Sequence, residues 1–539
     1  MVIFLMKKIG RVIHGSMEGI EIRKIPHVKA DIGEIICIPN DRKIFLYQIY
    51  DIEHRSMMSS KDIEFCAYNL DTYNDIEIYD RDQRYYEVLY AKPLVEILLD
   101  SKDYSFVKSL PKIFTEVYKI DDEIGKKIVE IVGEGLDIGM LRSGSEVLKV
   151  PIPFDINEAI NHHILIAATT GRGKSNLLRV LLWKMMYSNN VGLLVMDPHD
   201  EYVTPTKYSL AAHPNAQTNL LYYSSTNKSF FANSHRLLVD ISLLKPHHFL
   251  SVFNFSEPQM QAMYLAYQER NKEWIKELIM NEEFIKKLVE KGVKRETCDV
   301  LRRKLMFHLN IALNKDDRGN AILIYNSIFR EGVGERFVED ILSSLENGKI
   351  VVLDTSELTS SEELLVMSLL SHGIFDKYKY YKKRNELYVK AKIGIVLEEA
   401  PRVLNNVLLS NEGSIFGIIA REGRKFNIGL IAITQLPSLI PNEILSNMNT
   451  KIILGIEMQK ERNIIINSSP QDLSKDDKII ASLNKGEAII TSIFTPFPIP
   501  LRVHFFDELV DSHISTNTEE TKESFSAFKQ GYDDELDIE

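Results

Sequence analysis

The sequence predicts an α/β protein in which helices cover a parallel sheet, with a small β-barrel before the sheet and an all-helical insertion within it. Apolar runs without polar alternation recur after residue 150, as is typical of strands buried on both faces of a parallel sheet. Short alternating runs dominate the first 150 residues, and a stretch of helical periodicity divides the later apolar runs into two groups.

The composition is that of a large folded protein without a uniformly basic surface. The 539 residues are 45% hydrophobic and 26% charged, which suits about two to four folding units. The formal net charge of −11 excludes a nucleic-acid site spread over the whole surface, so any DNA site must be local. Cys37, Cys66 and Cys298 lie too far apart for a disulfide framework or the paired ligands of a zinc site, which favours a reducing, cytoplasmic setting.

No stretch of the sequence predicts a membrane span. The apolar start MVIFLM is interrupted by Lys7 and Lys8 before a signal-peptide core forms, and no apolar run reaches about eighteen residues. We therefore expect no membrane anchor, so that action at a membrane would need a partner to hold the protein there.

Residues 1–150 are expected to form one N-terminal β-barrel domain. Helices are predicted within it near Leu94–Phe114 and Asp121–Val132, after which GLDIGML and EVLKVPI resume strand character. The alternation of apolar and polar residues predicts strands in IGRVIHG, GIEIRKI, GEIICIPNDRKIFLYQIYDI and YYEVLYAKPL.

From residue 151 the apolar runs predict a sheet in two parts, with a helical insertion between them. The insertion contains SEPQMQAMYLAYQERNKEWIKELIM, which has helical periodicity and opens on Ser256 as a plausible N-cap. The last residues carry eight acidic side chains against two basic ones and predict a mobile tail. The expected strands are HILIAA, VGLLVMD, KIVVLD, KIGIVLEE, IGLIAIT and TKIILGI. The expected limits are 151–244 and 337–514 for the two parts of the core, 245–336 for the insertion and 515–539 for the tail.

The strongest local pattern is HILIAATTGRGKSNLLRVLLWKMM, which reads as a strand, a glycine-containing turn and an amphipathic helix. Gly171 and Gly173 let consecutive backbone N–H groups point at phosphate oxygens, and the helix adds its positive N-terminal end. Lys174 is placed to contact the β- and γ-phosphates, and Ser175 to bind Mg²⁺. We therefore expect a P-loop that binds ATP or GTP. Its expected nucleotide-binding residues are Thr170, Gly171, Arg172, Gly173, Lys174, Ser175 and Asn176.

One position departs from the P-loop pattern GxxxxGK[ST]. Ala168 stands where that pattern has its first glycine, and because alanine is the smallest replacement we expect a small backbone adjustment. A chance glycine turn is the competing interpretation. The preceding strand, the following helix and the Lys-Ser pair in register weigh against it.

A P-loop needs acidic partners at the end of a nearby strand, and two predicted strands supply them. Glu398 and Glu399 directly follow KIGIVL, and we assign Glu398 to Mg²⁺ and Glu399 to the attacking water. Asp197 ends VGLLVMD, where the carboxyl ends of parallel strands face the ligand, and it is expected to support the nucleotide and its metal. His199 is expected to be a loop hydrogen-bonder. The competing interpretation is an exposed strand end that carries charge, which is common for one acid and less common for two.

Three further polar residues flank the run IGLIAIT. Gln435 follows it, where an amide is placed to contact the γ-phosphate and report its loss. Arg421 and Arg424 precede it and are candidates for an arginine finger delivered by another subunit of a ring. Arginines on a solvated helix end explain the same pattern equally well from the residues alone.

In their order and spacing, these motifs resemble those of the HerA branch of the HerA/FtsK superfamily. The motifs are GRGKSN, DPHDEY, LEEAP, AREGRKF, TQLPSLIPNEILSNMNTKIIL and GEAII. The resemblance spans nearly the whole chain and implies a RecA-like P-loop NTPase core behind a barrel like the HAS barrel of that family. It also implies a homo-hexameric ring that moves along double-stranded DNA with ATP and works with a NurA-like nuclease in DNA end resection.

The resemblance also implies roles for single residues. These are Lys174 and Ser175 for the phosphates and Mg²⁺, Glu399 for the catalytic water, Arg424 ahead of Arg421 for the finger in trans, and Gln435 for sensing. The family usually has Asp-Glu-Ala-His where this chain has Glu398, Glu399, Ala400 and Pro401. The longer side chain at Glu398 and the loss of an imidazole at Pro401 are expected to alter the hydrolysis rate.

A translocating ring needs positive charge only in its channel, since phosphate neutralisation is not sequence-specific. The loop 404–413 is well placed for a channel but contains no Lys or Arg. The basic stretches are KGVKRE and LRRKL in the insertion and DKYKYYKKRN before the Glu398 strand. Each of them is typical of a solvated helix face.

Two other functions fit the same motifs. A VirB4-like conjugation or secretion ATPase shares the DPHDEY type of strand end, but it predicts membrane association or another substrate. A nucleotide-gated scaffold for a nuclease or defence complex fits if the changes at Glu398 and Pro401 weaken hydrolysis. ATP hydrolysis measured with and without duplex DNA separates both from a translocase.

Overall fold

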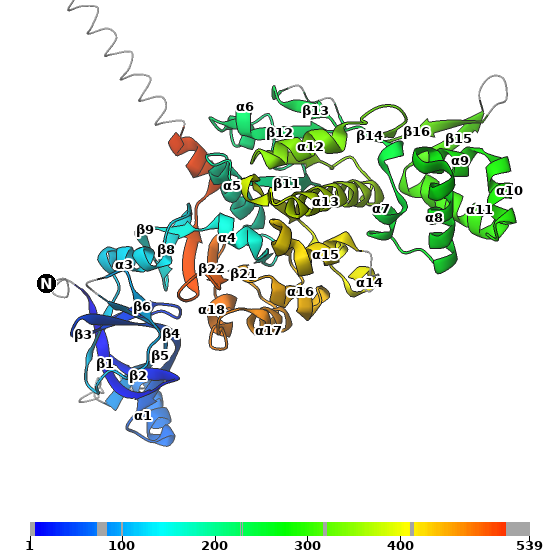
Figure 1. The fold of residues 1–539 in the computed structure, drawn as a ribbon. Helices are drawn as coiled ribbons and strands as arrows, with labels where there is room; N and C mark the ends of the chain where they lie inside the picture. Colours follow the sequence, from blue (N-terminus) through cyan, green and yellow to red (C-terminus); the bar gives the residue numbers. More distant parts are fainter. Residues whose placement is uncertain are drawn as a thin grey trace, which may run out of the picture. The chain divides into compact units, whose positions relative to one another are not determined.

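The computed structural model describes residues 6–72, 84–98, 101–226, 228, 230–315, 321–409 and 414–513. The chain forms two compact units (Figure 1). The barrel unit contains residues up to Asp155 together with 168–172 and 449–503, and the sheet unit contains 156–167, 173–448 and the segment from His504. The expected acidic tail lies outside the described residues. In the described part of the chain, no helix is both long and apolar enough to cross a bilayer.

The barrel unit opens with an antiparallel barrel, as predicted. Its strand order is β2-β1-β7-β3-β4-β5-β6, and a further pairing of β2 with β5 closes it. Alternate residues point inward, and Ile22, Ile36, Phe45, Leu89 and Val117 lie buried in the core that they form. The strands are β1 (Lys8–Ser16), β2 (Gly19–Lys24), β3 (Ile35–Asn40), β4 (Lys43–Ser56), β5 (Tyr85–Leu98), β6 (Tyr104–Ser105) and β7 (Glu116–Lys119).

The helix predicted near Leu94–Phe114 is wrong. Strand β5 continues to Leu98 because its backbone is paired with β4 along the whole of both strands, from Lys43 opposite Leu98 to Ser56 opposite Tyr85. The pairing satisfies every second backbone group of the apolar run and overrides its local helical pattern. Helix α1 (Ser60–Thr72) was not predicted.

The second predicted helix is confirmed as α3 (Asp122–Val132). The carboxylate of Asp121 caps it by accepting from the N–H of Ile124 at 3.0 Å. The strands that follow, β8 (Leu136–Ser143) and β9 (Glu146–Phe154), leave the barrel.

Within the barrel unit, strands β8 and β9 pair in a run of five antiparallel strands. Its order is β21-β22-β23-β8-β9, built from β21 (Thr450–Leu454), β22 (Glu487–Ser492) and β23 (Ile499–Val503). Helices α17 (Gln459–Ser468) and α18 (Asp477–Ala481) lie between β21 and β22 in the sequence. The run TKIILGI therefore forms a strand, as predicted. Its pairing with β22 is antiparallel, whereas the sequence predicted a strand of a parallel sheet.

The sheet unit holds the predicted parallel sheet. Its strand order is β13-β12-β18-β11-β19-β20-β10, and every pair is parallel. Full burial of β11, β18 and β20 explains why their sequences show no alternation. The strands are β10 (Ile164–Ala167), β11 (Val191–Asp197), β12 (Leu220–Ser224), β13 (Ser234–Arg236), β18 (Ile350–Asp354), β19 (Lys392–Leu397) and β20 (Ile428–Thr434).

Helices pack against this sheet, which gives the RecA-like α/β core that the motifs predict. Helix α12 (Phe337–Glu346) packs on β11 and β18, and α4 (Ile156–Asn161) and α15 (Ile415–Glu422) pack on β20. Helix α13 (Ser360–Lys383) packs against α12 and α15. Helix α5 (Lys174–Met185) follows β10.

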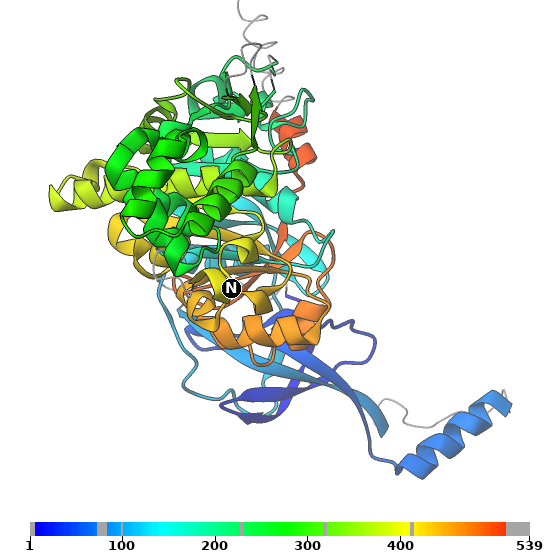
Figure 2. The same ribbon diagram turned by 90° about the vertical axis from the view of Figure 1, so that its right-hand side faces the viewer.

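The helical insertion is present but is not all-helical to its expected end. Its helices lie together (Figures 1 and 2, green), and Ser256 is the N-cap of α8, as predicted, with its backbone N–H donating to Oε1 of Gln259 at 3.2 Å. After α11 the chain forms an antiparallel hairpin of β15 (Ile311–Lys315) and β16 (Ala321–Tyr325). The helices are α7 (Pro246–Leu250), α8 (Glu257–Arg270), α9 (Trp274–Met280), α10 (Glu282–Glu290) and α11 (Arg295–His308).

Candidate functional site

Several of the polar residues that the sequence predicts lie at the carboxyl edge of the parallel sheet in the sheet unit. Asp197 ends β11, and Glu398 follows the end of β19. Strand β20 lies between β10 and β19, so Gln435, which follows β20, lies between the P-loop strand and the Glu398 strand along this edge. Carboxyl ends of parallel strands are where open α/β sheets bind their ligands.

The turn between β10 and α5 has the backbone of a phosphate loop. Gly171 and Gly173 have φ of +79° and +106°, values that residues with a Cβ rarely adopt. A Cβ on Gly171 would meet no atom within 4 Å, so backbone conformation and not space requires glycine there. Gly173 gives α5 no side-chain cap, which leaves the N-terminal turn of that helix open to an anion.

Ala168 is buried at 1% exposure, in keeping with the small residue that the turn tolerates at this position. Arg172 donates to the carbonyl of Leu483 at 3.1 Å and pairs with Glu457 at 2.8 Å, both within the barrel unit. The Arg172 side chain therefore anchors the turn, a role that the sequence did not predict.

Asn176 is held by the segment that follows β23. Its amide donates to the carbonyl of His504 at 2.8 Å and accepts from the N–H of Phe506 at 2.9 Å. Both ends of its side-chain amide are thus used within the sheet unit. The sequence predicts that Asn176 binds the nucleotide. In the structure, its side chain instead holds the segment that follows β23.

Lys174 and Glu398 lie close enough to influence each other electrostatically. Burial lowers the pKa of Lys174, and the nearby Glu398 carboxylate raises it in part. Burial raises the pKa of Glu398 to about 8, although the Tyr202 hydroxyl donates a hydrogen bond to it and opposes that rise. Asp197 and Glu201 raise the pKa of Glu398 further, as like charges do. A carboxyl group with a pKa near 8 is mainly protonated at pH 7 when no cation neutralises it.

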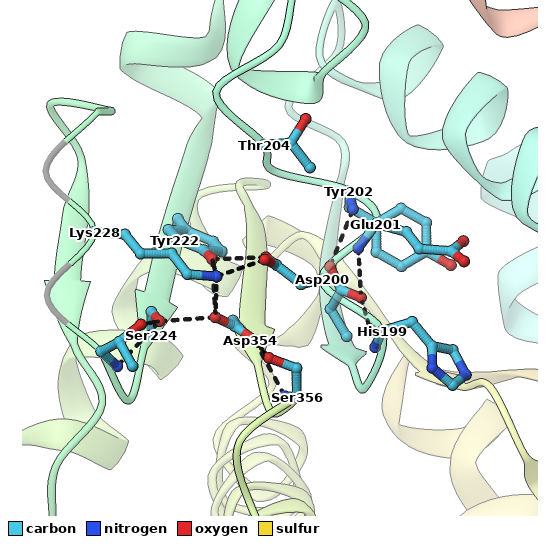
Figure 3. A network of polar contacts seen from close by, with 12 residues as sticks. His199, Asp200, Glu201, Tyr202, Thr204, Tyr222, Ser224, Lys228, Asp354 and Ser356 are labelled. Carbon is cyan, nitrogen blue, oxygen red and sulfur yellow. Dashed lines mark hydrogen bonds and ion pairs between the residues drawn. The ribbon is translucent and has the colours of Figure 1, made fainter.

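Asp197 shapes the loop that carries Tyr202. It is fully buried, and its carboxylate accepts from the N–H groups of His199, Glu201 and Tyr202 at 3.3, 3.0 and 3.0 Å. Burial raises its pKa to about 6, and these hydrogen bonds oppose the rise. The backbone of His199 serves this loop, as expected for a loop hydrogen-bonder. Figure 3 shows the loop, with Tyr202 and Glu201 on one side of it and Asp200 on the other.

Glu399 differs from its neighbour because it is exposed. Its side chain is 62% exposed, and Arg402 lies one turn on with Nε at 4.0 Å from its Oε2. Arg402 also pairs with the buried Glu363 at 2.8 Å. A cavity of about 20 Å³, lined by Glu363, Glu398, Glu399 and Arg402 among others, lies beside them. That volume holds a single water molecule.

The two candidate finger arginines lie at the opposite edge of the sheet. Arg424 is exposed in the turn that precedes β20, and it contributes, after burial, to lowering the pKa of His162, which precedes β10. Arg421 lies in the last turn of α15, and its guanidinium is 3.9 Å from the carboxylate of Glu443. The structure therefore does not bring either arginine to the Lys174 and Glu398 of the same chain.

Three residues at the carboxyl edge, near Glu398 and Glu399, were not predicted from the sequence. Tyr202 was within the DPHDEY motif, but only the fold shows that its hydroxyl reaches Glu398 across 196 residues of sequence. Arg402 lies three residues after Glu399, a spacing that could have predicted the contact between them. Glu363 lies in the first turn of α13 and carried none.

The donor set suits Mg²⁺ together with a nucleotide. Ser175 and Glu398 offer a hydroxyl and a carboxylate oxygen, the kinds of ligand that this hard cation prefers. Across the described ranges, no group of three or more His, Cys, Asp or Glu side chains is gathered as a metal site. Mg²⁺ commonly takes one or two protein ligands and completes its shell with phosphate oxygens and water.

Comparison with known proteins adds to this geometry. Residues 136–374 match the family described as Helicase HerA, central domain. The chain is 26% identical over 426 residues to the DNA double-strand break repair helicase HerA of Pyrococcus furiosus, which covers 73% of each chain. It is 27% identical over 448 residues to the protein of the same name from Saccharolobus solfataricus, covering 81% of this chain and 82% of that one.

Solved structures resemble the chain less closely. VirB4 of Thermoanaerobacter pseudethanolicus is 16% identical at a TM-score of 0.44, covering 69% of this chain and 97% of that one. The plasmid coupling protein TrwB, in complex with ADP and Mg²⁺, is 12% identical at a TM-score of 0.44, covering 71% of this chain and 92% of that one. TM-scores this low assign no function.

Proposed function

We propose that the chain is an ATP-hydrolysing member of the HerA family and a DNA-repair helicase that translocates on double-stranded DNA. The finer proposal is a homo-hexameric ring that uses ATP and Mg²⁺ and passes DNA to a NurA-like nuclease during end resection. The relatives named as DNA double-strand break repair helicases support the repair function.

A single observation carries the proposal, which is the meeting of Lys174 with Glu398 at the carboxyl edge of one sheet. Lys174 opens α5 directly after a glycine-rich turn in left-handed conformation, where it binds the β- and γ-phosphates. Ser175 and Glu398 would hold Mg²⁺, which when bound neutralises charge that develops on the phosphates. Asp197 supports Glu398 by folding the loop that bears Tyr202.

Glu399 orients and deprotonates the attacking water in this proposal. It is exposed, so it can face the nucleotide, and Arg402 limits its orientation from one turn away. Burial keeps the neighbouring Glu398 in a different environment, so two adjacent carboxylates can take different roles. Gln435, between the P-loop strand and the Glu398 strand, is placed to sense the γ-phosphate.

The position of the arginines supports an assembly of several copies. Arg424 and Arg421 lie at the amino edge of the sheet, away from the Lys174 and Glu398 of their own chain. In a ring, that edge of one copy faces the nucleotide of the next, where an arginine stabilises charge in the transition state. We propose Arg424 as the finger and Arg421 as its alternative.

The basic stretches of the insertion do not supply the DNA contact in this proposal. Lys291 pairs with Glu269, and Arg295 and Arg302 both pair with Glu282. Such local neutralisation is typical of a solvated helix face. The loop 404–413 is described only up to Leu409.

Steady-state ATP hydrolysis, measured with and without linear duplex DNA, tests the proposed function. We expect DNA to stimulate turnover in the wild type, and Lys174→Ala to abolish both basal and stimulated turnover because it removes the phosphate contact. Equal DNA-stimulated phosphate release by Lys174→Ala would show that the phosphate site is wrong. Nucleotide binding without turnover would favour a nucleotide-gated scaffold instead. The mass of the particle with duplex DNA, and with a NurA-like nuclease added, tests the ring and the partner.

A further inference from the structure

A second, partly buried polar cluster lies at the carboxyl edge of the parallel sheet, at the ends of β12 and β18. Lys228 is its centre, and the cluster joins the loop after β11 to the two strands next to it (Figure 3). We call it the Lys228 cluster. Its members are Lys228, Asp200, Tyr222, Ser224, Asp354 and Ser356. Asp200 belongs to the DPHDEY motif, but Lys228 and Asp354 belong to none of the motifs, and the function proposed above does not use the cluster.

Lys228 satisfies all three of its N–H donors within the cluster. Its Nζ lies 2.6 Å from Oδ2 of Asp200, 2.7 Å from Oδ2 of Asp354 and 3.2 Å from the hydroxyl of Tyr222. Its side chain is 24% exposed, so the ammonium has left most of its water for these partners. A lysine fixed in this way loses the conformational freedom that surface lysines keep.

Asp354 is well satisfied even without considering Lys228. It is fully buried, and its Oδ1 accepts from the backbone N–H and the hydroxyl of Ser356 at 3.1 and 2.6 Å. Its Oδ2 accepts from Ser224 at 2.7 Å and Tyr222 at 3.1 Å. Lys228 therefore balances the charge of Asp354, but Asp354 does not need it as its only donor. The bond from Lys228 to Asp200 requires a separate explanation.

Asp200 sits at the turning point of the loop 198–202. Its φ of +54° lies in the left-handed region, which residues with a Cβ rarely occupy. The flanking N–H groups of His199 and Glu201 bind Asp197, while the Asp200 side chain points the other way, toward Lys228 and Tyr222 (Figure 3). The loop is thus held from both sides. Asp197 holds its backbone, and Lys228 holds its outer side chain.

The same loop delivers Tyr202 to the carboxylate of Glu398. Movement of Asp200 would move Tyr202, which is only two residues away and whose N–H is also bound to Asp197 at 3.0 Å. We infer that Lys228 is a positioning residue for ATP hydrolysis, which holds the loop 198–202 through Asp200 so that Tyr202 stays hydrogen-bonded to Glu398. This inference rests on the proposed function, because it assumes that Glu398 serves hydrolysis.

The experiment must separate this role from the stability of the cluster. Lys228→Met alone leaves the buried charge of Asp354 uncompensated and can simply fail to fold. We therefore compare Asp354→Asn with the double variant Lys228→Met/Asp354→Asn, in which no such charge remains. Among the described residues, the ion pair that differs between the two is the one from Lys228 to Asp200. Lys207→Met is the matched control, since Lys207 is an exposed lysine paired with Asp511 at 3.0 Å.

Each variant is measured for thermal midpoint, affinity for a non-hydrolysable ATP analogue with Mg²⁺, and kcat with duplex DNA. We expect the double variant to match Asp354→Asn in thermal midpoint and analogue affinity, but to have a kcat lower by roughly 10- to 100-fold, as for a misplaced catalytic group. Asp200→Asn/Asp354→Asn should show the same loss, because it removes the other end of the contact. Lys207→Met should leave all three quantities unchanged.

Two results would overturn the inference. One is a double variant whose kcat equals that of Asp354→Asn. The other is a parallel loss of thermal midpoint, affinity and kcat, which would make Lys228 structural only. Failure of the proposed function is distinguishable, because the wild type itself would then show no DNA-stimulated turnover.

Discussion

The two edges of the parallel sheet differ in how far their charged side chains are buried. At the carboxyl edge, Asp197 is fully buried and burial raises the pKa of Glu398 to about 8. At the amino edge, Arg421 and Arg424 remain in solvent. Burying the acids costs folding free energy, since a charged form loses its hydration. The arginines carry no such cost.

In the proposed assembly, the carboxyl edge takes the nucleotide and the amino edge faces a second copy of the chain. Strand β20 has seven residues and separates the arginine end from the Gln435 end, a span of roughly 20 Å. An arginine cannot cover that span to reach the acids of its own chain. The complementary charges of the two edges therefore fit the proposal that one copy completes the site of another.

The largest expected effect on turnover comes from removing an arginine at the amino edge. Arg424→Ala should lower kcat by about 10³-fold while the affinity for ATP is retained, because an arginine finger acts on transition-state charge. Lys425→Ala is the matched control, since Lys425 is the exposed neighbour that pairs only weakly with Glu422 at 3.8 Å. Normal turnover by Arg424→Ala would shift the role to Arg421, and normal turnover by both single variants would exclude a finger from this edge.

The second largest expected effect on turnover comes from neutralising an acid at the carboxyl edge. Glu399→Gln should lower kcat by roughly 10²- to 10³-fold without weakening nucleotide binding, because the amide cannot take a proton from water. Glu386→Gln, which changes an exposed glutamate paired with Arg384 at 2.7 Å, is the control. Single-turnover and binding measurements check the result, and a Glu399→Gln protein with full turnover would remove Glu399 from the chemistry.

A third prediction measures the folding cost of the buried acid. Because the pKa of Glu398 is about 8 in the folded state against an ordinary 4.5, the folded state binds more protons than the unfolded state between these values. Folding stability must therefore fall as pH rises from about 4.5 to 8. Glu398→Gln should remove this loss and stabilise the metal-free protein at pH 8.5 by on the order of 2 kcal/mol, with no gain at pH 4.

Urea unfolding in chelator at both pH values checks this third prediction. The same variant should lose ATP hydrolysis, so stability and turnover would move in opposite directions at one residue. Equal destabilisation at both pH values would show that Glu398 is not held as a desolvated acid.

The smallest expected effect concerns Tyr202. Its hydroxyl donates to Glu398 and holds the pKa of that carboxyl lower than burial alone would set it. Tyr202→Phe should therefore shift the acid limb of the pH profile for kcat upward by up to about one pH unit. Tyr208→Phe, which changes an exposed hydroxyl 3.2 Å from Asp511, should leave the profile in place. A downward shift in Tyr202→Phe would contradict this account of the hydrogen bond.

The sequence predicted the parts of the molecule whose signal is local. Five of the predicted strands were recognisable because burial on both faces leaves continuous apolar runs, and the P-loop because its glycines, Lys174 and Ser175 are adjacent. The acids after β19 were recognisable for the same reason. Where function depends on residues within one turn of chain, the pattern was sufficient.

The sequence could not predict contacts between residues far apart in the chain. Strand β5 was assigned to a helix because only its pairing with β4 shows that it is extended. Lys228 and Asp354 are 126 positions apart, and neither belongs to a motif. Strands β8 and β9 were assigned to the barrel because strand character does not reveal the sheet, and β23 pairs with β8 from more than 350 residues away.

The measurement that tests the central claim most directly is turnover by a mixture of two inactive variants. Glu399→Gln and Arg424→Ala copies are co-expressed with different tags and purified together. If each site combines the acids of one copy with the arginine of the next, random mixing restores about a quarter of the sites, and DNA-stimulated hydrolysis returns to about that share of wild type. A mixed assembly that stays as inactive as either variant alone would contradict the account.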